Sequence, residues 1–307
     1  VLWRKLPGAR AAGRVQSVAL RLVCDREAEI ERFVRQDYWL VAALLDTPRG
    51  ETFEARLTEL DGRKLQKLDI KSQEEADSIK ALLEGASYRV LSVEAKPTRR
   101  NPAPPFITST LQQAASSRLD FSGSRTMQIA QRLYEGVDIG GETTGLITYM
   151  RTDGVQMAPE ALEQARQAVA RTFGDRYLPD KPRYYSSKAK NAQEAHEAIR
   201  PTDFSRTPDE VRKYLDPDQA RLYEMIWKRA IASQMAAAEI ERTTVEIEAA
   251  GADRKAVLRA VGSVIRFDGF LAAYTEVKED DSEDGEDTRL PEINSGETLA
   301  RRAINVT

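Results

Sequence analysis

The sequence predicts a mixed α and β fold in which a β-rich domain is interrupted by a mainly helical domain. Two observations predict it. Alternating apolar and polar residues, typical of half-buried strands, occur at residues 38–100 and return at 243–278. Between these stretches the apolar residues recur at helical spacing, so we expect the strands to flank a helical unit of residues 101–242.

The N-terminal elements follow from this periodicity. Apolar residues one helical turn apart predict an amphipathic helix from Gly13 to Arg35. The segment Asn101–Pro105 (NPAPP) predicts a stiff linker and a domain boundary. Between them, the pattern predicts strands at residues 38–45, 53–57 and 88–94 and a helix at 74–83.

Helical periodicity dominates the middle of the chain. Ser109 and Ser124 are predicted N-caps, because a hydroxyl can accept a hydrogen bond from an unpaired N–H of the first turn. Pro159 suits the first position of a helix, where its missing N–H costs no hydrogen bond. The predicted helices span residues 109–118, 124–134, 159–173 and 217–235, and strand patterns return at 243–277.

Composition excludes several classes of protein. The 307 residues include one cysteine and one histidine, which excludes an internal disulfide framework, a cysteine-based zinc site and a His-rich metal centre. We therefore expect no metal ligands in this chain, and a reducing, cytoplasmic location. No apolar run reaches the roughly 18 residues of a membrane span, so we expect neither a membrane protein nor a signal peptide.

The charges are unevenly distributed. The formal net charge is -3, yet the nine residues from Glu279 to Asp287 (EDDSEDGED) hold seven acids, and the remaining residues carry a net +4. Bases outnumber acids by eight to four in residues 1–35, six to one in 96–134 and five to two in 181–200. Any one basic segment could be a solvated helix face. Together they predict a surface for a phosphate backbone, and the acidic run predicts a solvated loop.

The first motif with chemical meaning is GLITYMRTDG, residues 145–154. On an extended segment Tyr149 and Arg151 would share a face, so a phenol and a guanidinium could meet one phosphate. Tyrosine is a poor nucleophile at neutral pH, since its pKa is about 10, and a permanently charged arginine would favour attack on phosphorus. The structural alternative is a partly buried Tyr at a strand end beside a surface Arg.

Two further motifs could contact phosphate. In AQEAHEAIRPTD, residues 192–203, His196 and Arg200 would share one face of a helix and could hold a phosphate oxygen, with Glu194 and Glu197 orienting them. The alternative is a structural histidine. In AGRVQS, residues 12–17, a helix start offers backbone N–H groups and polar side chains. The alternative is an ordinary solvated helix start.

Taken together, six segments of the chain resemble the bacterial type IA DNA topoisomerases, of the topoisomerase I kind. The segments are AAGRVQSVALRLVCDREAEIERF, FITSTLQQAASSRL, AQRLYEG, GLITYMRTD, AQEAHEAIRPTD and IRFDGF. The resemblance covers essentially the whole chain. It implies a toroidal fold: residues 1–37 in a helical base domain, 38–100 with 243–278 in a β-rich arch, 101–242 in a helical tyrosine domain, and 279–307 returning toward the base.

The resemblance also implies the chemistry. Tyr149 would attack a single-strand phosphodiester, forming a 5′-phosphotyrosine that is later resealed, and so relax negative supercoils without ATP. Arg151 and His196 would position the scissile phosphate and stabilise its charge. The remaining residues expected to contact DNA are Arg14, Gln16, Ser17, Thr110, Gln112, Gln131, Thr152, Asp153, Glu197 and Arg200.

Part of the family's machinery has no counterpart in this sequence. The Toprim domain, with its Asp-x-Asp-x-Glu magnesium site, and the C-terminal DNA-binding repeats are not found, so we expect a fragment. The implied partners are single-stranded and negatively supercoiled DNA and a Toprim domain in cis, with Mg2+ needed only by the full-length enzyme. We expect a monomer in the nucleoid that alone does not relax DNA.

Two residues depart from the family pattern, and other functions stay open. Gly154 stands where Ser is common and could loosen the turn beside Arg151; Ala12 also replaces a Ser. A tyrosine recombinase or a relaxase also forms phosphotyrosine, but these need other Arg and His arrangements. A non-catalytic single-stranded DNA-binding module would use Tyr149 only to stack on a base.

Overall fold

The computed structural model describes residues 13–186, 196–275 and 289–307. Helices and strands are both present, which confirms the mixed α and β class. The chain forms two compact units, each assembled from separate segments. Unit 1 comprises Val1–Arg89, Ile247–Arg259 and Thr298–Thr307, and unit 2 comprises Val90–Glu246 and Ala260–Glu297. The domain boundaries expected at residues 37, 100, 242 and 278 stay a prediction.

An antiparallel sheet runs through both units: β1, β2, β3 and β9 belong to unit 1, whereas β4, β7 and β8 each have residues in both units. Its strand order is β1-β9-β4-β7-β8-β2-β3, and β1 also pairs with β2, so the sheet closes on itself. The predicted strands are confirmed, and β4 extends further than expected because it pairs with β7 as well as β9. The strands are β1 (Val41–Asp46), β2 (Thr52–Leu60), β3 (Arg63–Lys64), β4 (Ser87–Arg100), β7 (Ala238–Ala250), β8 (Lys255–Phe267) and β9 (Thr298–Val306).

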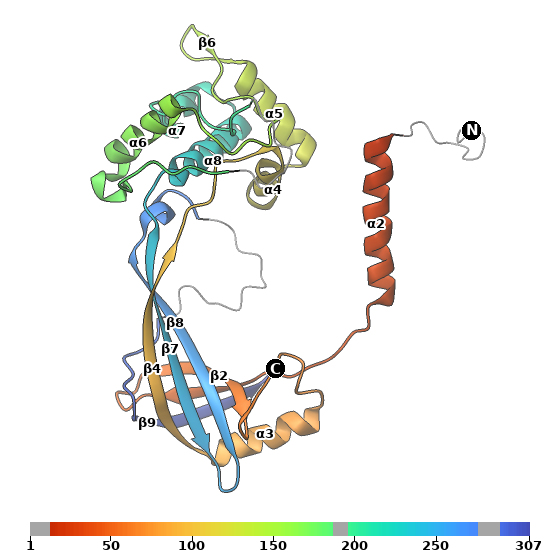
Figure 1. Ribbon diagram of the computed structural model, residues 1–307, viewed down its shortest axis with the longest axis vertical. Coiled ribbons are helices and arrows are strands. Elements are labelled where there is room, and N and C mark those ends of the chain that lie inside the picture. Colours follow the sequence, from red (N-terminus) through yellow and green to blue (C-terminus); the bar gives the residue numbers. More distant parts are fainter. Residues whose placement is uncertain (1–12, 187–195, 276–288) are drawn as a thin grey trace, which may run out of the picture. The chain divides into compact units, whose positions relative to one another are not determined.

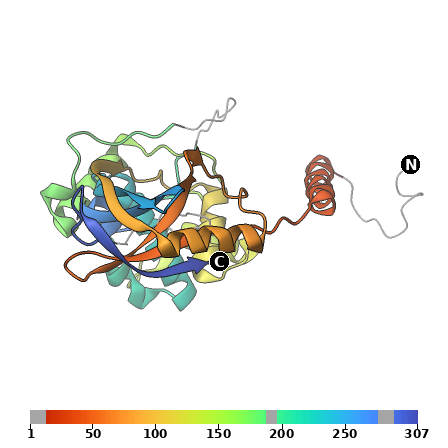
Figure 2. The ribbon, with the colours of Figure 1, turned by 90° about the horizontal axis from the view of Figure 1, so that it is seen from below.

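One helix covers the sheet of unit 1. Helix α3 (Gln73–Gly85) lies beside β9, as Figure 2 shows with α3 in orange and β9 in blue. Ser72 caps it by accepting a hydrogen bond from the N–H of Glu75. The helix buries Ile79 and Leu83, and Tyr88 at the start of β4 donates a hydrogen bond to the Leu83 carbonyl at 2.6 Å. This packing forms the core of unit 1.

The helix predicted near the N-terminus is confirmed as α2 (Arg14–Arg32), three residues shorter at its C-terminal end than expected. Its apolar residues are not buried: Val15 is 80% exposed and Val23 is 65% exposed. The periodicity therefore predicted the helix correctly, although the apolar side chains pack against nothing within the described residues.

Unit 2 is mainly helical and is built around α8, which contacts the helices near it in Figure 1. Helix α8 buries Leu222, Tyr223, Ile226 and Trp227. Its capping residue is Asp216, which accepts a hydrogen bond from the Gln219 N–H. Besides parts of β4, β7 and β8, the elements of this unit are α4 (Thr108–Leu119), α5 (Gly123–Glu135), β5 (Val137–Asp138), β6 (Thr143–Thr144), α6 (Pro159–Phe173), η1 (Asp175–Tyr177), α7 (Pro208–Val211), η2 (Arg212–Tyr214), α8 (Pro217–Ser233) and η3 (Gly269–Ala272).

Two predicted N-caps were wrong, each by two residues. The N-cap of α4 is Ile107 rather than Ser109, because the Thr110 hydroxyl accepts a hydrogen bond from the Ile107 N–H at 3.0 Å. The N-cap of α5 is Ser122 rather than Ser124. The hydroxyls that accept hydrogen bonds at these starts are those of Thr110 for α4 and Ser122 for α5. The position of Pro159 at the start of α6 is confirmed.

Some predictions fall outside the described residues: Ala12, Glu194 and the acidic run from Glu279 to Asp287. Within the ranges that the structure covers, no helix combines the length and the apolar character that crossing a bilayer requires.

Candidate active site

Tyr149 lies on an irregular segment of unit 2 between β6 and α6. The segment is held to α5 by a hydrogen bond of 2.7 Å from the Leu146 N–H to the Leu133 carbonyl. This approach requires Gly145, because a Cβ at that position would lie 2.5 Å from the carbonyl oxygen of Tyr134. Glycine therefore allows the segment to lie directly against the last turn of α5.

The described part of the histidine motif, His196–Asp203, runs alongside the tyrosine segment and is not helical; it is called the histidine segment below. Ile147 forms an isolated antiparallel bridge with Pro201, and the Thr148 N–H donates to the Arg200 carbonyl at 2.9 Å. The predicted helical pairing of His196 with Arg200 is therefore wrong. The physical reason is Pro201, which disfavours helical backbone at the residue before it.

The Thr148 hydroxyl links the two segments a second time. It donates a hydrogen bond to the Ala198 carbonyl at 2.7 Å and accepts one from the Arg200 N–H at 3.0 Å. Residues about fifty positions apart in the sequence are thus joined next to Tyr149.

This pairing places three rings together. The ring centroids of Tyr149 and His196 are 5.2 Å apart with an interplanar angle of 49°, and those of Tyr134 and Tyr149 are 5.4 Å apart at 66°. Tyr149 is half-buried, whereas His196 is exposed. The predicted pair of Tyr149 and His196 is brought together, and Tyr134 from α5 completes the set. Tyr134 was not predicted as a site residue, although it lies in the motif AQRLYEG.

Arg151 lies in a bend of the backbone that hydrogen bonds with Thr108 hold in place. The chain bends at Met150 and Arg151, so the extended geometry that would place Tyr149 and Arg151 on one face is not observed. The side chain of Met150 is buried, and the Thr108 hydroxyl donates to the Met150 carbonyl at 2.9 Å and accepts from the Thr152 N–H at 2.9 Å. Arg151 itself is exposed.

The polar side-chain groups of Tyr149, Arg151 and His196 have no partner among the described residues. Among the residues that the structure describes, the Tyr149 hydroxyl, the Arg151 guanidinium and the His196 imidazole make no hydrogen bond and no ion pair. Their neighbours, by contrast, are extensively hydrogen-bonded. The arrangement leaves a phenol hydroxyl, a guanidinium and an imidazole available to a ligand on a firmly held backbone.

Glu197 and Arg200 pair with each other, and their predicted role in DNA contact stays a prediction. Arg200 forms an ion pair with Glu197 at 2.8 Å, and the Glu197 carboxylate also accepts a hydrogen bond from the Ala158 N–H at 2.9 Å, at the start of α6. Burial raises the pKa of Glu197, but the hydrogen bonds from Arg200 and Ala158 outweigh it, and the net pKa is lowered. Glu197 therefore fixes the histidine segment to a helix N-terminus.

Gly154 brings the turn after Arg151 against the histidine segment. A Cβ at residue 154 would lie 2.3 Å from the His196 carbonyl oxygen and 3.2 Å from the Thr152 hydroxyl. Gly154 therefore permits a close backbone contact that a side chain at this position would disturb, and its expected effect on the firmness of the turn stays a prediction.

The other predicted DNA contacts lie in several places. The Thr110 hydroxyl accepts a hydrogen bond from the Ile107 N–H at the start of α4, and Gln112 lies on the same helix. On α5 the Gln131 side-chain amide donates a hydrogen bond to the Glu135 carboxylate at 2.5 Å. Thr152 is buried and accepts a hydrogen bond from the Gly154 N–H, whereas Asp153 is exposed. Arg14, Gln16 and Ser17 lie in the first turn of α2 in unit 1, where Ser17 donates to the Gly13 carbonyl at 3.2 Å.

The described residues form no cluster of metal-ligating side chains. None of the groups of His, Cys, Asp and Glu side chains within the described ranges has the three or more members close enough to hold a metal ion. The residues that the structure describes therefore do not form a magnesium site of their own.

Comparison with known proteins gives a consistent result. The family model for DNA topoisomerase matches residues 1–307. DNA topoisomerase 1 of Rickettsia felis is 47% identical over 304 residues, which are 99% of this chain and 39% of that protein. DNA topoisomerase 1 of Zymomonas mobilis is 50% identical over 308 residues, 99% of this chain and 24% of that protein.

A solved structure agrees with these relatives. Full-length topoisomerase I from Thermotoga maritima aligns with a TM-score of 0.79 and 33% identity, over 100% of this chain and 46% of that one. The chain thus spans less than half the length of each of these three relatives.

Proposed function

Because the chain belongs to the bacterial DNA topoisomerase family, we propose that it carries the tyrosine nucleophile of a type IA DNA topoisomerase I. The observation that carries the proposal is the packing of Tyr149 between Tyr134 and His196, with its hydroxyl unused by the described residues. Two ring contacts restrict the rotation of the Tyr149 side chain, so the hydroxyl is presented in a narrow range of positions.

In the proposed reaction the Tyr149 hydroxyl oxygen attacks the phosphorus of a single-strand phosphodiester. The P–O bond to the 3′ oxygen breaks, so the products are a 5′-phosphotyrosine and a free 3′-hydroxyl. The proton lost by the phenol is balanced by the proton that the 3′ oxygen gains. After another strand passes, the 3′-hydroxyl attacks the phosphotyrosine and reverses the step. One phosphodiester replaces another, so no ATP is required.

Arg151 and His196 supply positive charge and hydrogen-bond donors to this reaction. A guanidinium can hold two phosphate oxygens at once, which stabilises the extra negative charge of the transition state. A protonated His196 would donate to a third position on the same phosphate. Both side chains are exposed on an anchored backbone, so a strand can reach them without rearrangement of the core.

The DNA strand is proposed to contact a wider set of residues. The proposed direct contacts in unit 2 are Thr110, Gln112, Gln131, Asp153 and Arg200, and those in unit 1 are Arg14, Gln16 and Ser17. Glu197 accepts hydrogen bonds from Arg200 and from the Ala158 N–H, and the Thr152 hydroxyl accepts one from the Gly154 N–H in the turn. Glu197 and Thr152 are therefore proposed as positioning residues rather than direct contacts.

Several components are proposed to come from the longer protein. A Toprim domain would bring its own carboxylates and Mg2+ to Tyr149, because the described residues of this chain form no metal site. The proposed substrate is negatively supercoiled DNA with a single-stranded region. The whole enzyme is proposed to be a monomer that works at the nucleoid in the bacterial cytoplasm.

The non-catalytic alternative uses Tyr149 as a stacking platform for a base. Neighbouring rings already contact Tyr149, and stacking on a base would require at least one of them to move. The geometry therefore favours the nucleophile.

The test is covalent trapping. The full-length parent protein is incubated with an end-labelled single-stranded oligonucleotide and denatured, and the covalent adduct is measured for the parent and for Tyr149→Phe. We expect Tyr149→Phe to form no adduct. Tyr134→Phe is the matched control, since it removes a hydroxyl from the adjacent ring and should still form the adduct. An adduct that survives in Tyr149→Phe and disappears in Tyr134→Phe would identify Tyr134 as the nucleophile instead.

A further inference from the structure

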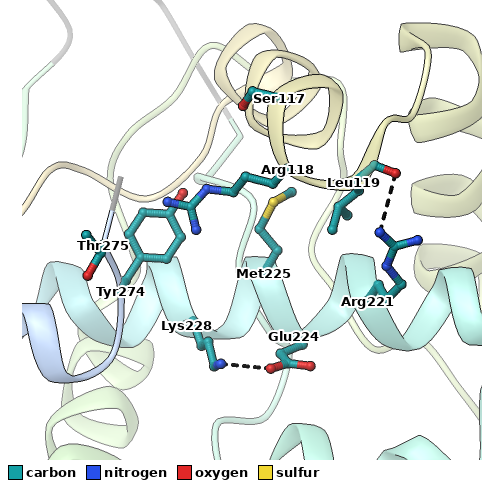
Figure 3. A pocket seen from close by; sticks show the side chains of 9 residues that line it. All are labelled: Ser117, Arg118, Leu119, Arg221, Glu224, Met225, Lys228, Tyr274 and Thr275. Atoms are coloured by element: carbon teal, nitrogen blue, oxygen red, sulfur yellow. Dashed lines mark hydrogen bonds and ion pairs between the residues drawn. The ribbon is translucent and has the colours of Figure 1, made fainter. Parts of the chain in front are cut away.

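A second basic site lies in unit 2 at the other end of α4. Thr108, which holds the Tyr149 segment, begins this helix, whereas Arg118 lies in its last turn, roughly 15 Å away along the helix axis. There a cavity of about 630 Å³ opens between α4, α8 and the residues after η3 (Figure 3). A cavity of roughly 300–1,000 Å³ is typical of small-ligand sites.

Positive charge predominates in this cavity. Its lining includes Arg118, Arg221 and Lys228 against one carboxylate, Glu224. Glu224 pairs with Lys228 at 2.7 Å, so that carboxylate is already neutralised. Among the described residues, neither Arg118 nor Arg221 has a carboxylate partner. Two guanidinium groups from different helices are therefore available to an anion.

The guanidinium groups are held in place by rings. Arg118 lies over the Tyr274 ring at 4.3 Å from the centroid, which leaves its N–H edges directed away from the ring. Arg221 lies 5.3 Å from the Phe121 centroid, and its guanidinium donates to the Leu119 carbonyl at 3.5 Å. Side chains positioned in this way lose little conformational entropy when they bind a ligand.

The floor between the two arginines is apolar. In Figure 3 the Met225 side chain rises from α8 between the Arg118–Tyr274 pair and Leu119. Met225 and Tyr274 are buried at 6% and 5% exposure, so they form part of the surface of the core. A ligand that matches the cavity needs an anionic group for the arginines and a flat, weakly polar group for the floor.

We propose that this cavity binds a nucleotide, with its base on Met225 and phosphate groups at the arginines on either side of it, Arg118 and Arg221. The nucleotide could be free or part of a DNA strand, since the recognised chemistry is the same. An acidic peptide would match the arginines but would leave the apolar floor unused. Binding here does not depend on the reaction proposed for Tyr149, because the two sites share no residue.

Methionine methyl resonances provide a direct test. The chain contains five methionines, of which Met225 lies in the cavity and Met150 next to Tyr149. The whole 307-residue chain, labelled at the methionine methyl carbons, is titrated with thymidine monophosphate, a short oligothymidylate, thymidine, inorganic phosphate and polyglutamate. We expect the Met225 signal to shift with the oligothymidylate, with the monophosphate, or with both. A shift with both identifies free nucleotides as ligands too, and a shift with the oligothymidylate alone restricts the ligand to a strand.

Variants show whether the cavity itself is responsible. Arg118→Gln and Arg221→Gln should each raise the half-saturating concentration about fivefold or more, because each loses charge-assisted hydrogen bonds to a phosphate group. Arg176→Gln is the matched control: Arg176 also lies over a ring, that of Phe267 at 4.5 Å, outside the cavity. The other four methionine signals report whether each variant is folded. Arg118→Lys is a second variant, which keeps the charge and loses the planar fork, and it should also weaken binding.

Four results would overturn the proposal. They are an unmoved Met225 signal with both nucleotide probes, a shift as large with thymidine or polyglutamate, a shift as large with inorganic phosphate, and equal weakening by Arg176→Gln. Tyr149→Phe should leave the Met225 shift unchanged while abolishing the covalent adduct of the parent, so failure of one proposal is distinguished from failure of the other.

Discussion

Thr148→Val is expected to separate the tyrosine segment from the histidine segment. Valine has nearly the same shape as threonine but has no hydroxyl, so the substitution removes two hydrogen bonds without creating a large cavity. The Ala198 carbonyl loses its donor at 2.7 Å, and the Arg200 N–H loses its acceptor at 3.0 Å. The backbone hydrogen bond from the Thr148 N–H to the Arg200 carbonyl remains.

The structure allows the magnitude of this effect to be worked out. Ala198 is fully buried, so its carbonyl cannot readily recover a hydrogen bond from water. A buried polar group left unpaired costs about 1–3 kcal/mol. The substitution removes the hydrogen-bond partner of two groups, the Ala198 carbonyl and the Arg200 N–H. Thr148 is only half-buried, which permits partial hydration, so we expect a loss of about 2–4 kcal/mol in the free energy of unfolding of unit 2.

The single histidine of the chain provides the assay. The imidazole proton signals of His196 need no assignment among several histidines, and the Tyr149 ring 5.2 Å away should shift them. Urea unfolding followed at these signals measures the stability of the region that contains the site, and their position in native buffer reports the contact between the rings. Thr148→Ser is the matched control, because it keeps the hydroxyl. The reasoning would be refuted if the Val variant matched the Ser variant in both urea midpoint and chemical shift.

Three other outcomes are expected. Gly154→Ala should lower the free energy of unfolding by about 1–3 kcal/mol in a denaturant titration, because its Cβ would meet the His196 carbonyl oxygen at 2.3 Å; Gly85→Ala, with no atom within 4 Å of the added Cβ, should have little effect. Glu197→Gln should cost about 1 kcal/mol at neutral pH, since Arg200 loses its carboxylate partner while the pair remains partly hydrated. The folded-state pKa of Glu197 is lowered, so its stabilisation is present above the unfolded pKa and is lost as the pH falls through the folded pKa; unfolding curves below about pH 4.5 should show less pH dependence in the variant. The isolated 307 residues should bind single-stranded DNA with an affinity that falls steeply with salt, yet leave a negatively supercoiled plasmid unrelaxed on a gel; relaxation by the chain alone would contradict the need for a further domain.

Much of the fold could be predicted because the signals are local. The apolar period changes at the strands and helices themselves, and Pro159 fixed one helix start correctly. The starts of α4 and α5 were less predictable, since several hydroxyls compete as caps within a few residues and their choice depends on neighbouring backbone. The helical reading of His196 and Arg200 was wrong for a related reason: the segment pairs with residues far away in the sequence.

The sequence by itself determined the family, the chemistry-bearing motifs and the alternation of strands and helices, because these are properties of neighbouring residues. Only the tertiary structure decided which side chains meet. The ring of Tyr134 beside Tyr149, the pairing of Glu197 with Arg200 and the basic cavity at Arg118 all depend on packing between elements that sequence spacing does not specify. Periodicity records which side chains are apolar, whereas hydrogen bonds and ring contacts across segments are set only when the core excludes water and fixes the backbone.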